Sequence, residues 1–119
     1  MTSKFTELCI DCWDRERLAA FWAEVLGYET KYEDDEVFIE GSTGSGPIIL
    51  FPVVPEGKTV KNRLHIDVNP TDGDQSDEVR RLENLGATKI DIGQGDVSWV
   101  VMADPEGNEF CVLKGRIDV

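Results

Sequence analysis

The sequence predicts an α+β fold made of two tandem βαβββ modules. Residues 8–11 (Leu-Cys-Ile-Asp) are echoed by residues 64–67 (Leu-His-Ile-Asp). Each block precedes a helical pattern that ends in Leu-Gly, at residues 26–27 and at residues 85–86, and strand-like segments follow both. Half of such a repeat cannot bury its own apolar face, so the two copies should cover each other, and the space between them is the natural place for a ligand.

This repeat sets the expected architecture. We predict a single domain over residues 1–119, with module one at about 1–56 and module two at about 57–119. The eight strands should curve into one mixed eight-stranded sheet, a half-barrel, with both helices on its outside. The turn at residues 55–58 is the expected junction of the modules.

The first module begins with an alternating strand at residues 5–12. Asp14 is a suitable N-cap for the helix that follows, and Gly27 is suited to end it. The helix has an apolar stripe at helical spacing, made of Leu18, Phe21, Trp22, Val25 and Leu26. Three strands are then expected, two of them in a hairpin around Asp34 and Asp35, at residues 28–32, 36–40 and 47–54.

The second module repeats this order. A strand at residues 63–69 leads into a helix that Ser76 should cap and Gly86 should end. Proline and glycine at residues 104–108 predict a tight turn between the last two strands. The three remaining strands are expected at residues 88–92, 98–102 and 109–113.

Alternation gives each lead strand two different faces. The apolar rows should face the helices, and the polar rows should face the concave side of the sheet. The apolar rows are Leu8, Ile10 and Cys12, and Leu64, Ile66 and Val68; the polar rows are Glu7, Cys9 and Asp11, and His65, Asp67 and Asn69. Cys9 and Cys12 form a C-x-x-C, but positions three apart in a strand point to opposite faces, so we interpret this motif as accidental.

Composition excludes several classes of protein. The net charge is −12, from 24 acidic and 12 basic residues, which disfavours nucleic acid and anionic membrane surfaces. No apolar run approaches the ~20 residues of a membrane span. Three cysteines do not close into a disulfide framework, and no secretory signal is evident, so we expect a cytoplasmic protein.

Three longer segments carry a family resemblance. They are residues 14–27, with Phe-Trp and Val-Leu-Gly, residues 63–68 (Arg-Leu-His-Ile-Asp-Val), and residues 98–110, with Asp-Pro-Glu-Gly-Asn. With the doubled βαβββ pattern, the chain resembles the vicinal oxygen chelate superfamily, and looks closest to its small glyoxalase-like, bleomycin-resistance-like branch. That resemblance implies a cavity for a small organic molecule in the concave sheet, and a homodimer.

The resemblance also implies where a divalent metal would be held. Its ligands come from the lead and last strands of each module, and these places fall on Glu7, His65 and Cys111. The fourth place falls on the aliphatic residues 48–50, so a degraded site without metal is favoured over an intact one. When the two repeated four-residue segments are aligned, Cys9, not Glu7, corresponds to His65. Both alternatives stay open.

The candidate site residues follow from these placements. His65 is the only histidine and is the candidate ligand or general base, with Glu7 as its acid–base partner. Candidates for contact with the ligand are Asp67, Cys9, Phe38, Trp99 and Cys111. Core packing would explain Phe38 and Trp99 equally well, and a small buried hydrophobe is the more common role for a free cysteine.

Two functions compete at this point. The first is an enzyme of the lyase or isomerase type, in which His65 assists proton transfer beside a carbonyl or enolate. The alternative is a protein of the bleomycin-resistance type that binds or sequesters a small molecule without chemistry. The sequence does not identify the ligand.

Overall fold

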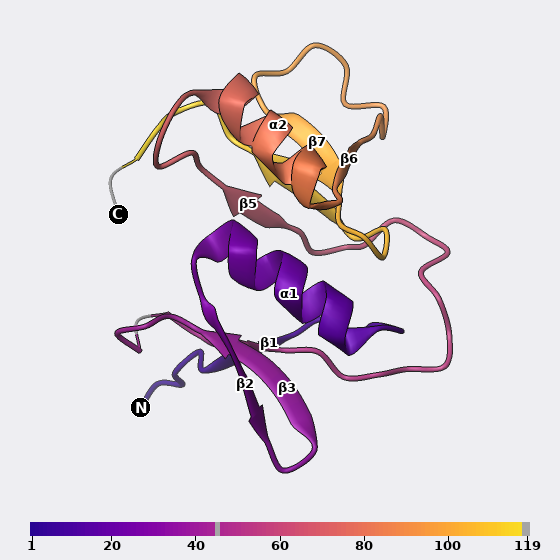
Figure 1. Cartoon of the computed structure of the whole chain (residues 1–119). Coiled ribbons are helices and arrows are strands. Elements are labelled where there is room, and N and C mark those ends of the chain that lie inside the picture. Colours follow the sequence, from indigo (N-terminus) through magenta and orange to yellow (C-terminus); the bar gives the residue numbers. More distant parts are fainter. Residues whose placement is uncertain (45, 118–119) are drawn as a thin grey trace. The chain divides into compact units, whose positions relative to one another are not determined.

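The computed structural model describes residues 1–44 and 46–117, and it divides into two compact units, residues 1–57 and 58–119. Each unit holds one helix and one four-stranded sheet (Figure 1). Eight strands and two helices in the order βαβββ, taken twice, confirm the predicted fold class. The hydrogen-bonded ladders among the described residues form two sheets of four strands.

The first unit has the strand order β1-β4-β3-β2. Strand β1 runs parallel to β4, and the other neighbours are antiparallel. Its elements are β1 (Glu7–Cys9), α1 (Arg15–Leu26), β2 (Glu29–Glu33), β3 (Glu36–Glu40) and β4 (Ile48–Leu50).

Both predicted ends of α1 are confirmed. The Asp14 carboxylate accepts a hydrogen bond from the Arg17 N–H at 3.2 Å, and Gly27 ends the helix with a φ of 68°. Leu18 and Trp22 are fully buried on the face of α1 that packs against β3. The β2–β3 hairpin turns at Asp34 and Asp35, both with positive φ, as a tight two-residue turn requires.

The second unit repeats this topology, with the strand order β5-β8-β7-β6 and β5 parallel to β8. Its elements are β5 (Ile66–Val68), α2 (Gln75–Leu85), β6 (Thr88–Lys89), β7 (Val100–Ala103) and β8 (Glu109–Val112). Helix α2 packs against β6 and β8. Phe110 and Val112 on β8 are fully buried with Leu82 of α2, and together they form the core of this unit.

Several sequence predictions for the second unit need correction. The N-cap of α2 is Asp74, not Ser76, because the Asp74 carboxylate accepts from the Asp77 N–H at 2.9 Å while Asp77 bonds the Asp74 N–H in return. Leu64 is 82% exposed and does not lie under a helix. It lies before β5, where the ladder with β8 has not yet begun.

Most strands are shorter than the sequence suggested, although β3 has its predicted bounds and β2 its predicted length. In the first unit β1 ends at Cys9, and beyond it Cys12 pairs with Val53 in an isolated bridge outside the named strands. The strand expected at residues 88–92 is reduced to the two residues of β6. Neither helix of the described residues has the length and apolar character that crossing a membrane demands.

Candidate functional site

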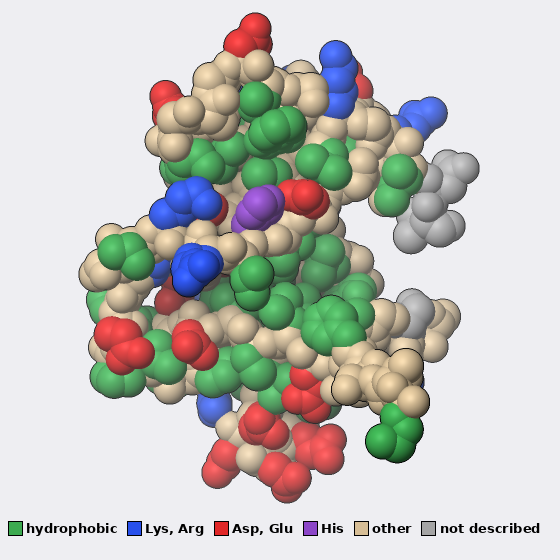
Figure 2. Space-filling model, turned by 180° about the vertical axis from the view of Figure 1, so that it is seen from behind, with side chains coloured by type: hydrophobic (Ala, Val, Ile, Leu, Met, Phe, Trp, Pro, Cys, Tyr) green, Lys and Arg blue, Asp and Glu red, His purple; other side chains and the backbone are tan. Residues whose placement is uncertain are grey.

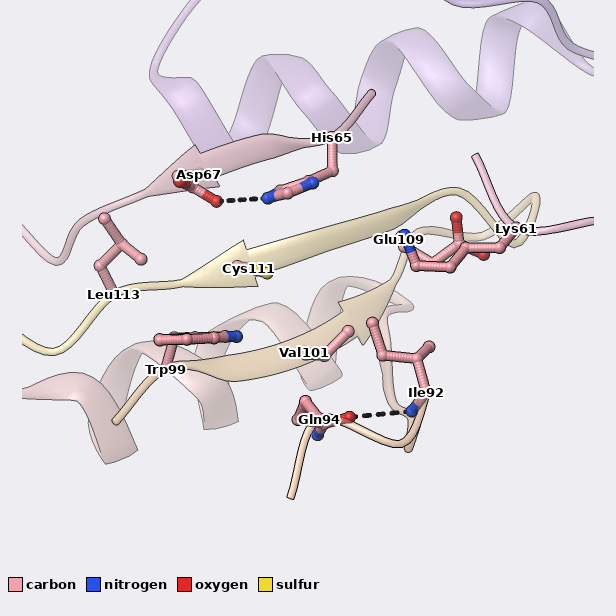
Figure 3. A pocket seen from close by; sticks show the side chains of 10 residues that line it. All are labelled: Lys61, His65, Asp67, Ile92, Gln94, Trp99, Val101, Glu109, Cys111 and Leu113. Carbon is pink, nitrogen blue, oxygen red and sulfur yellow. Dashed lines mark hydrogen bonds and ion pairs between the residues drawn. The ribbon is translucent and has the colours of Figure 1, made fainter. Parts of the chain in front are cut away.

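The centre of the candidate site is a histidine–aspartate pair at the start of β5. His65 directly precedes the strand and Asp67 lies within it, so both side chains project from the same face. Figure 2 shows this histidine, in purple, at the surface of the molecule. The His65 Nε2 atom lies 3.1 Å from the Asp67 Oδ1 atom, and both side chains are about half exposed, at 45% and 47% (Figure 3). The carboxylate therefore holds the imidazole in one orientation.

Cys111 lies beside this pair on the neighbouring strand. In the β5–β8 ladder it is the direct partner of Asp67, and in the β7–β8 ladder it is the partner of Val101. The three side chains form a row on the sheet face opposite the one that carries Phe110 and Val112. Because Phe110 and Val112 occupy the core beneath α2, the row faces away from the helix.

The local environment keeps the Cys111 thiol protonated. Burial raises its pKa, and the nearby Asp67 raises it further through its charge and a hydrogen bond that the thiol donates. Lys61 acts in the opposite direction and lowers it. Cys111 is thus a buried thiol whose protonation depends on two charged neighbours.

A pocket of about 460 Å³ lies over this row, and every residue that lines it belongs to the second unit. Figure 3 shows His65 and Asp67 on one side of Cys111, and Trp99 and Val101 on the other. The indole of Trp99 is 41% exposed, so one part of it is available to a ligand. The remaining lining residues are Lys61, Ile92, Gln94, Glu109 and Leu113. Most of the lining is apolar, with charged groups at the edges, as in ligand pockets of proteins generally.

A network of hydrogen bonds builds the end of the pocket near Glu109. Its carboxylate accepts from the Lys58 ammonium, and also from the Asn62 N–H at 2.8 Å. The Asn62 side chain donates to the Asn108 Oδ1 at 2.9 Å. Burial alone would raise the pKa of Glu109, but the hydrogen bonds from Lys58 and from backbone N–H groups, together with the charge of Lys58, hold the pKa below its ordinary value.

The Trp99 end is held by the second helix. The Gln75 Nε2 donates to the carbonyl of Ser98 and to that of Val112, each at 2.9 Å. Gln75 is the first residue of α2, so it ties the start of the helix to the segment that carries Trp99. The Gln94 Oε1 accepts from the Ile92 N–H at 2.9 Å and shapes the loop between β6 and β7.

The structure brings together four of the predicted residues, namely His65, Asp67, Trp99 and Cys111. The other three, Glu7, Cys9 and Phe38, belong to the first unit, where Glu7 and Cys9 are exposed on β1 and Phe38 is half-buried on β3. Their part in a site stays a prediction.

Sequence reasoning missed other lining residues, above all Lys61, Gln94 and Glu109. A usable signal existed for Glu109, because the alternation of residues 109, 111 and 113 places it on the same face as Cys111. Lys61 and Gln94 lie in loops, where no periodic pattern reports the direction of a side chain.

The donors of the second unit fit a borderline divalent ion. One ligand atom each from His65, Asp67 and Cys111 lies within 4.8 Å of the others. Imidazole, carboxylate and thiolate together suit Zn²⁺ or Co²⁺, whereas Mg²⁺ prefers oxygen ligands alone. In this cluster Asp67 supplies the carboxylate ligand. The sequence prediction had assigned the carboxylate ligand to Glu7 in the other module.

Alkylation should report the charges around Cys111. In Asp67→Asn we expect iodoacetamide at pH 8 to modify Cys111 several-fold faster than in wild type, because losing the carboxylate lowers the pKa of the thiol and the thiolate is the nucleophile. Lys61→Gln should slow the same reaction. Peptide mass spectrometry measures both rates, with exposed Cys9 as the internal reference. An unchanged Cys111 rate in both variants would contradict this electrostatic account.

Comparison with known proteins agrees with the fold. The sequence profile of the glyoxalase-like domain matches residues 7–113, nearly the whole chain. The protein therefore belongs to the glyoxalase-like domain family, and the resemblance to the vicinal oxygen chelate superfamily is confirmed. No curated protein matches the chain in sequence.

Solved structures of low sequence identity share the fold. The fosfomycin resistance protein FosX from Mesorhizobium loti has a TM-score of 0.71 and 17% identity, covering 98% of this chain and 95% of its own. A glyoxalase/bleomycin resistance protein/dioxygenase family enzyme from Burkholderia phytofirmans has a TM-score of 0.70 and 16% identity, covering 92% and 97%. A FosX variant from Listeria monocytogenes, complexed with Mn(II) and a dihydroxypropylphosphonic acid, has a TM-score of 0.68 and 17% identity, covering 98% and 94%.

Proposed function

We propose that this protein binds a small organic molecule in the pocket of its second unit, and that His65 moves a proton to or from that molecule. The observation that carries the proposal is the imidazole held by Asp67 at 3.1 Å at the edge of a largely apolar pocket. The fold similarity to fosfomycin resistance proteins and to a dioxygenase-family enzyme supports a small-molecule role.

The pairing with Asp67 gives the imidazole a defined role. When Nε2 carries the proton and donates it to the carboxylate, the lone pair of a neutral ring resides on Nδ1. In Figure 3 this second nitrogen faces away from Asp67, toward the end with Lys61 and Glu109. A carbon acid bound between Trp99 and His65 would meet a base whose tautomer is already set.

The reaction class that suits this arrangement is proton transfer beside a carbonyl. The C–H bond breaks, its proton passes to Nδ1 of His65, and the electron pair moves onto the carbonyl oxygen to form an enolate. Return of the proton to carbon completes an exchange or an isomerisation, and nothing is oxidised or reduced. In the alternative state in which His65, Asp67 and Cys111 hold a divalent ion, that ion would supply Lewis-acid polarisation of a ligand oxygen, and His65 would be a ligand instead of the base.

Hydrogen–deuterium exchange into a ketone tests the proposal. We expect wild type to accelerate exchange of the α-protons of phenylacetone in D₂O, measured by the loss of their proton NMR signal. His65→Ala should reduce this acceleration about 100-fold, which is the order of the rate contribution of a positioned general base. Leu64→Ala is the matched control, since Leu64 is the exposed neighbour of His65 and does not line the pocket.

Binding is measured in the same samples from the broadening of the aromatic proton signals of the ketone, which do not exchange and are present with every variant. Trp99→Ala should weaken ketone binding about tenfold, and Trp13→Ala, an exposed tryptophan of the first unit, should not change it. Exchange no faster than in buffer, with the ketone bound at Trp99, would reject the catalytic role of His65 and leave a binding protein.

That second candidate, non-catalytic binding, has its own support. The place of the fourth metal ligand in the first module is occupied by Ile48, Ile49 and Leu50 of β4, none of which can coordinate an ion. A protein of this kind would hold its ligand by shape and by stacking on Trp99. It would show the broadening without the exchange.

A further inference from the structure

The two ends of the pocket differ in charge. Figure 3 shows Lys61 and Glu109 together at one end, and Asp67 with Leu113 at the other. The Glu109 carboxylate is already paired with the Lys58 ammonium. With Lys61 added, this end holds two ammonium groups for one carboxylate and carries a local positive charge.

Hydrogen bonds of the neighbouring residue fix the position of Lys61. The next residue, Asn62, is tied to Glu109 through its N–H and to Asn108 through its side chain. The residue that follows Lys61 is therefore anchored to the turn before β8 and to the first residue of that strand. In the described part of the chain, the Lys61 ammonium itself donates to the Asn62 carbonyl at 3.3 Å, a long contact, and forms no ion pair. Its charge is available to a ligand.

The charge of Lys61 also reaches the floor of the pocket, where it opposes burial and Asp67 in setting the pKa of Cys111. Lys61 itself is exposed, so its attraction for an anion acts partly through water and is weakened by salt. The contrast with the rest of the molecule is large, since the whole chain carries a net charge of −12.

We infer that the ligand of this pocket is a small carboxylic acid with an apolar or aromatic body. Its carboxylate would pair with Lys61, and its body would lie along Val101 and Trp99 toward the His65–Asp67 pair. One ammonium matches one negative charge, whereas a phosphate dianion calls for more donors than Lys61 provides. This inference rests on the proposed small-molecule function and adds the chemical class of the ligand.

Two probes of equal shape and different charge test the inference. 2-Naphthoate and 2-naphthamide are titrated into the full-length protein, and dissociation constants are taken from the NMR shift of the Trp99 indole. We expect naphthoate to bind about tenfold more tightly than naphthamide, the order of magnitude for a hydrogen bond to a charged group. Added salt should reduce the difference.

Two variants test whether Lys61 causes the preference for naphthoate over naphthamide. In Lys61→Gln the two probes should bind with nearly equal affinity, while Lys89→Gln, on β6 and outside the pocket, should keep the wild-type ratio. Equal binding of both probes by wild type, or an undiminished preference in Lys61→Gln, overturns the carboxylate inference and leaves the small-molecule function standing. If neither probe shifts the Trp99 signal, the carboxylate inference fails, and the phenylacetone experiment decides the proposed function separately.

Discussion

Co²⁺ is expected to bind the wild-type protein at one ion per chain and to give a thiolate-to-cobalt charge-transfer band in the near ultraviolet. In Cys111→Ser this band should be absent, and the affinity for Co²⁺ should fall by at least about 100-fold, because a ligand is lost where an outer-shell change alone costs 10–100-fold. The basis is the cluster of imidazole, carboxylate and thiol atoms within 4.8 Å of one another. Absorption spectroscopy with equilibrium dialysis measures both quantities without reference to any reaction.

Single substitutions distinguish this site from one in which Cys9 of β1 supplies the sulfur ligand. His65→Ala and Asp67→Asn should each weaken binding, and Cys9→Ser should leave the band unchanged. If Cys9→Ser abolished the band while Cys111→Ser retained it, the ion would have its sulfur ligand on β1. Absence of any stoichiometric ion from wild type would reject a metal role for this cluster.

Glu109→Gln is expected to lower the free energy of unfolding by about 2 kcal/mol at pH 7. The glutamate is largely buried, with its side chain 9% exposed, and it accepts from both Lys58 and the Asn62 backbone, so the amide loses a charge-assisted hydrogen bond. Urea denaturation followed by circular dichroism gives the value. Glu83→Gln, on the exposed side of α2, is the matched control and should change stability little.

The same variant has a predicted pH dependence. The folded-state pKa of Glu109 lies below its unfolded value, so its stabilising contribution is fully present above the unfolded pKa of about 4.3 and is lost as pH falls through the folded pKa. The difference in unfolding free energy between wild type and Glu109→Gln should therefore shrink progressively below about pH 4. A difference that stays constant into strong acid would show that the charge of Glu109 does not contribute.

Local signals in the sequence predicted the elements well, but not the lengths of most strands. Asp14 and Gly27 act through their own backbone neighbours, so both ends of α1 could be assigned without knowledge of the fold. The cap of α2 was misplaced because Asp74 and Ser76 are both good capping residues, and only the reciprocal bonds with Asp77 decide between them. Strand ends depend on where a partner strand stops, and that is not local information.

The residues of the candidate site also fall into two groups, those that local patterns predict and those whose positions depend on contacts distant in the chain. Period two placed His65 and Asp67 on one face of β5, and the family resemblance pointed to Cys111 on β8. Lys61 could not be predicted from the sequence. The position of its side chain depends on hydrogen bonds from Asn62 to Glu109 and Asn108, which are 47 and 46 residues away. Gln75 was missed for a similar reason, since it acts on carbonyls that are distant in the chain.

The sequence by itself determined the doubled βαβββ order, the faces of the strands and the chemical types available to the site, because these depend on periodicity and on residues close together in the chain. Only the tertiary structure decided that Asp67 and Cys111 are register partners, that the thiol is buried beside a carboxylate, and that Lys61 carries charge to the end of the pocket. Those features arise from strand pairing and from side-chain bonds between distant segments. Their geometry is set by packing, which no local pattern encodes.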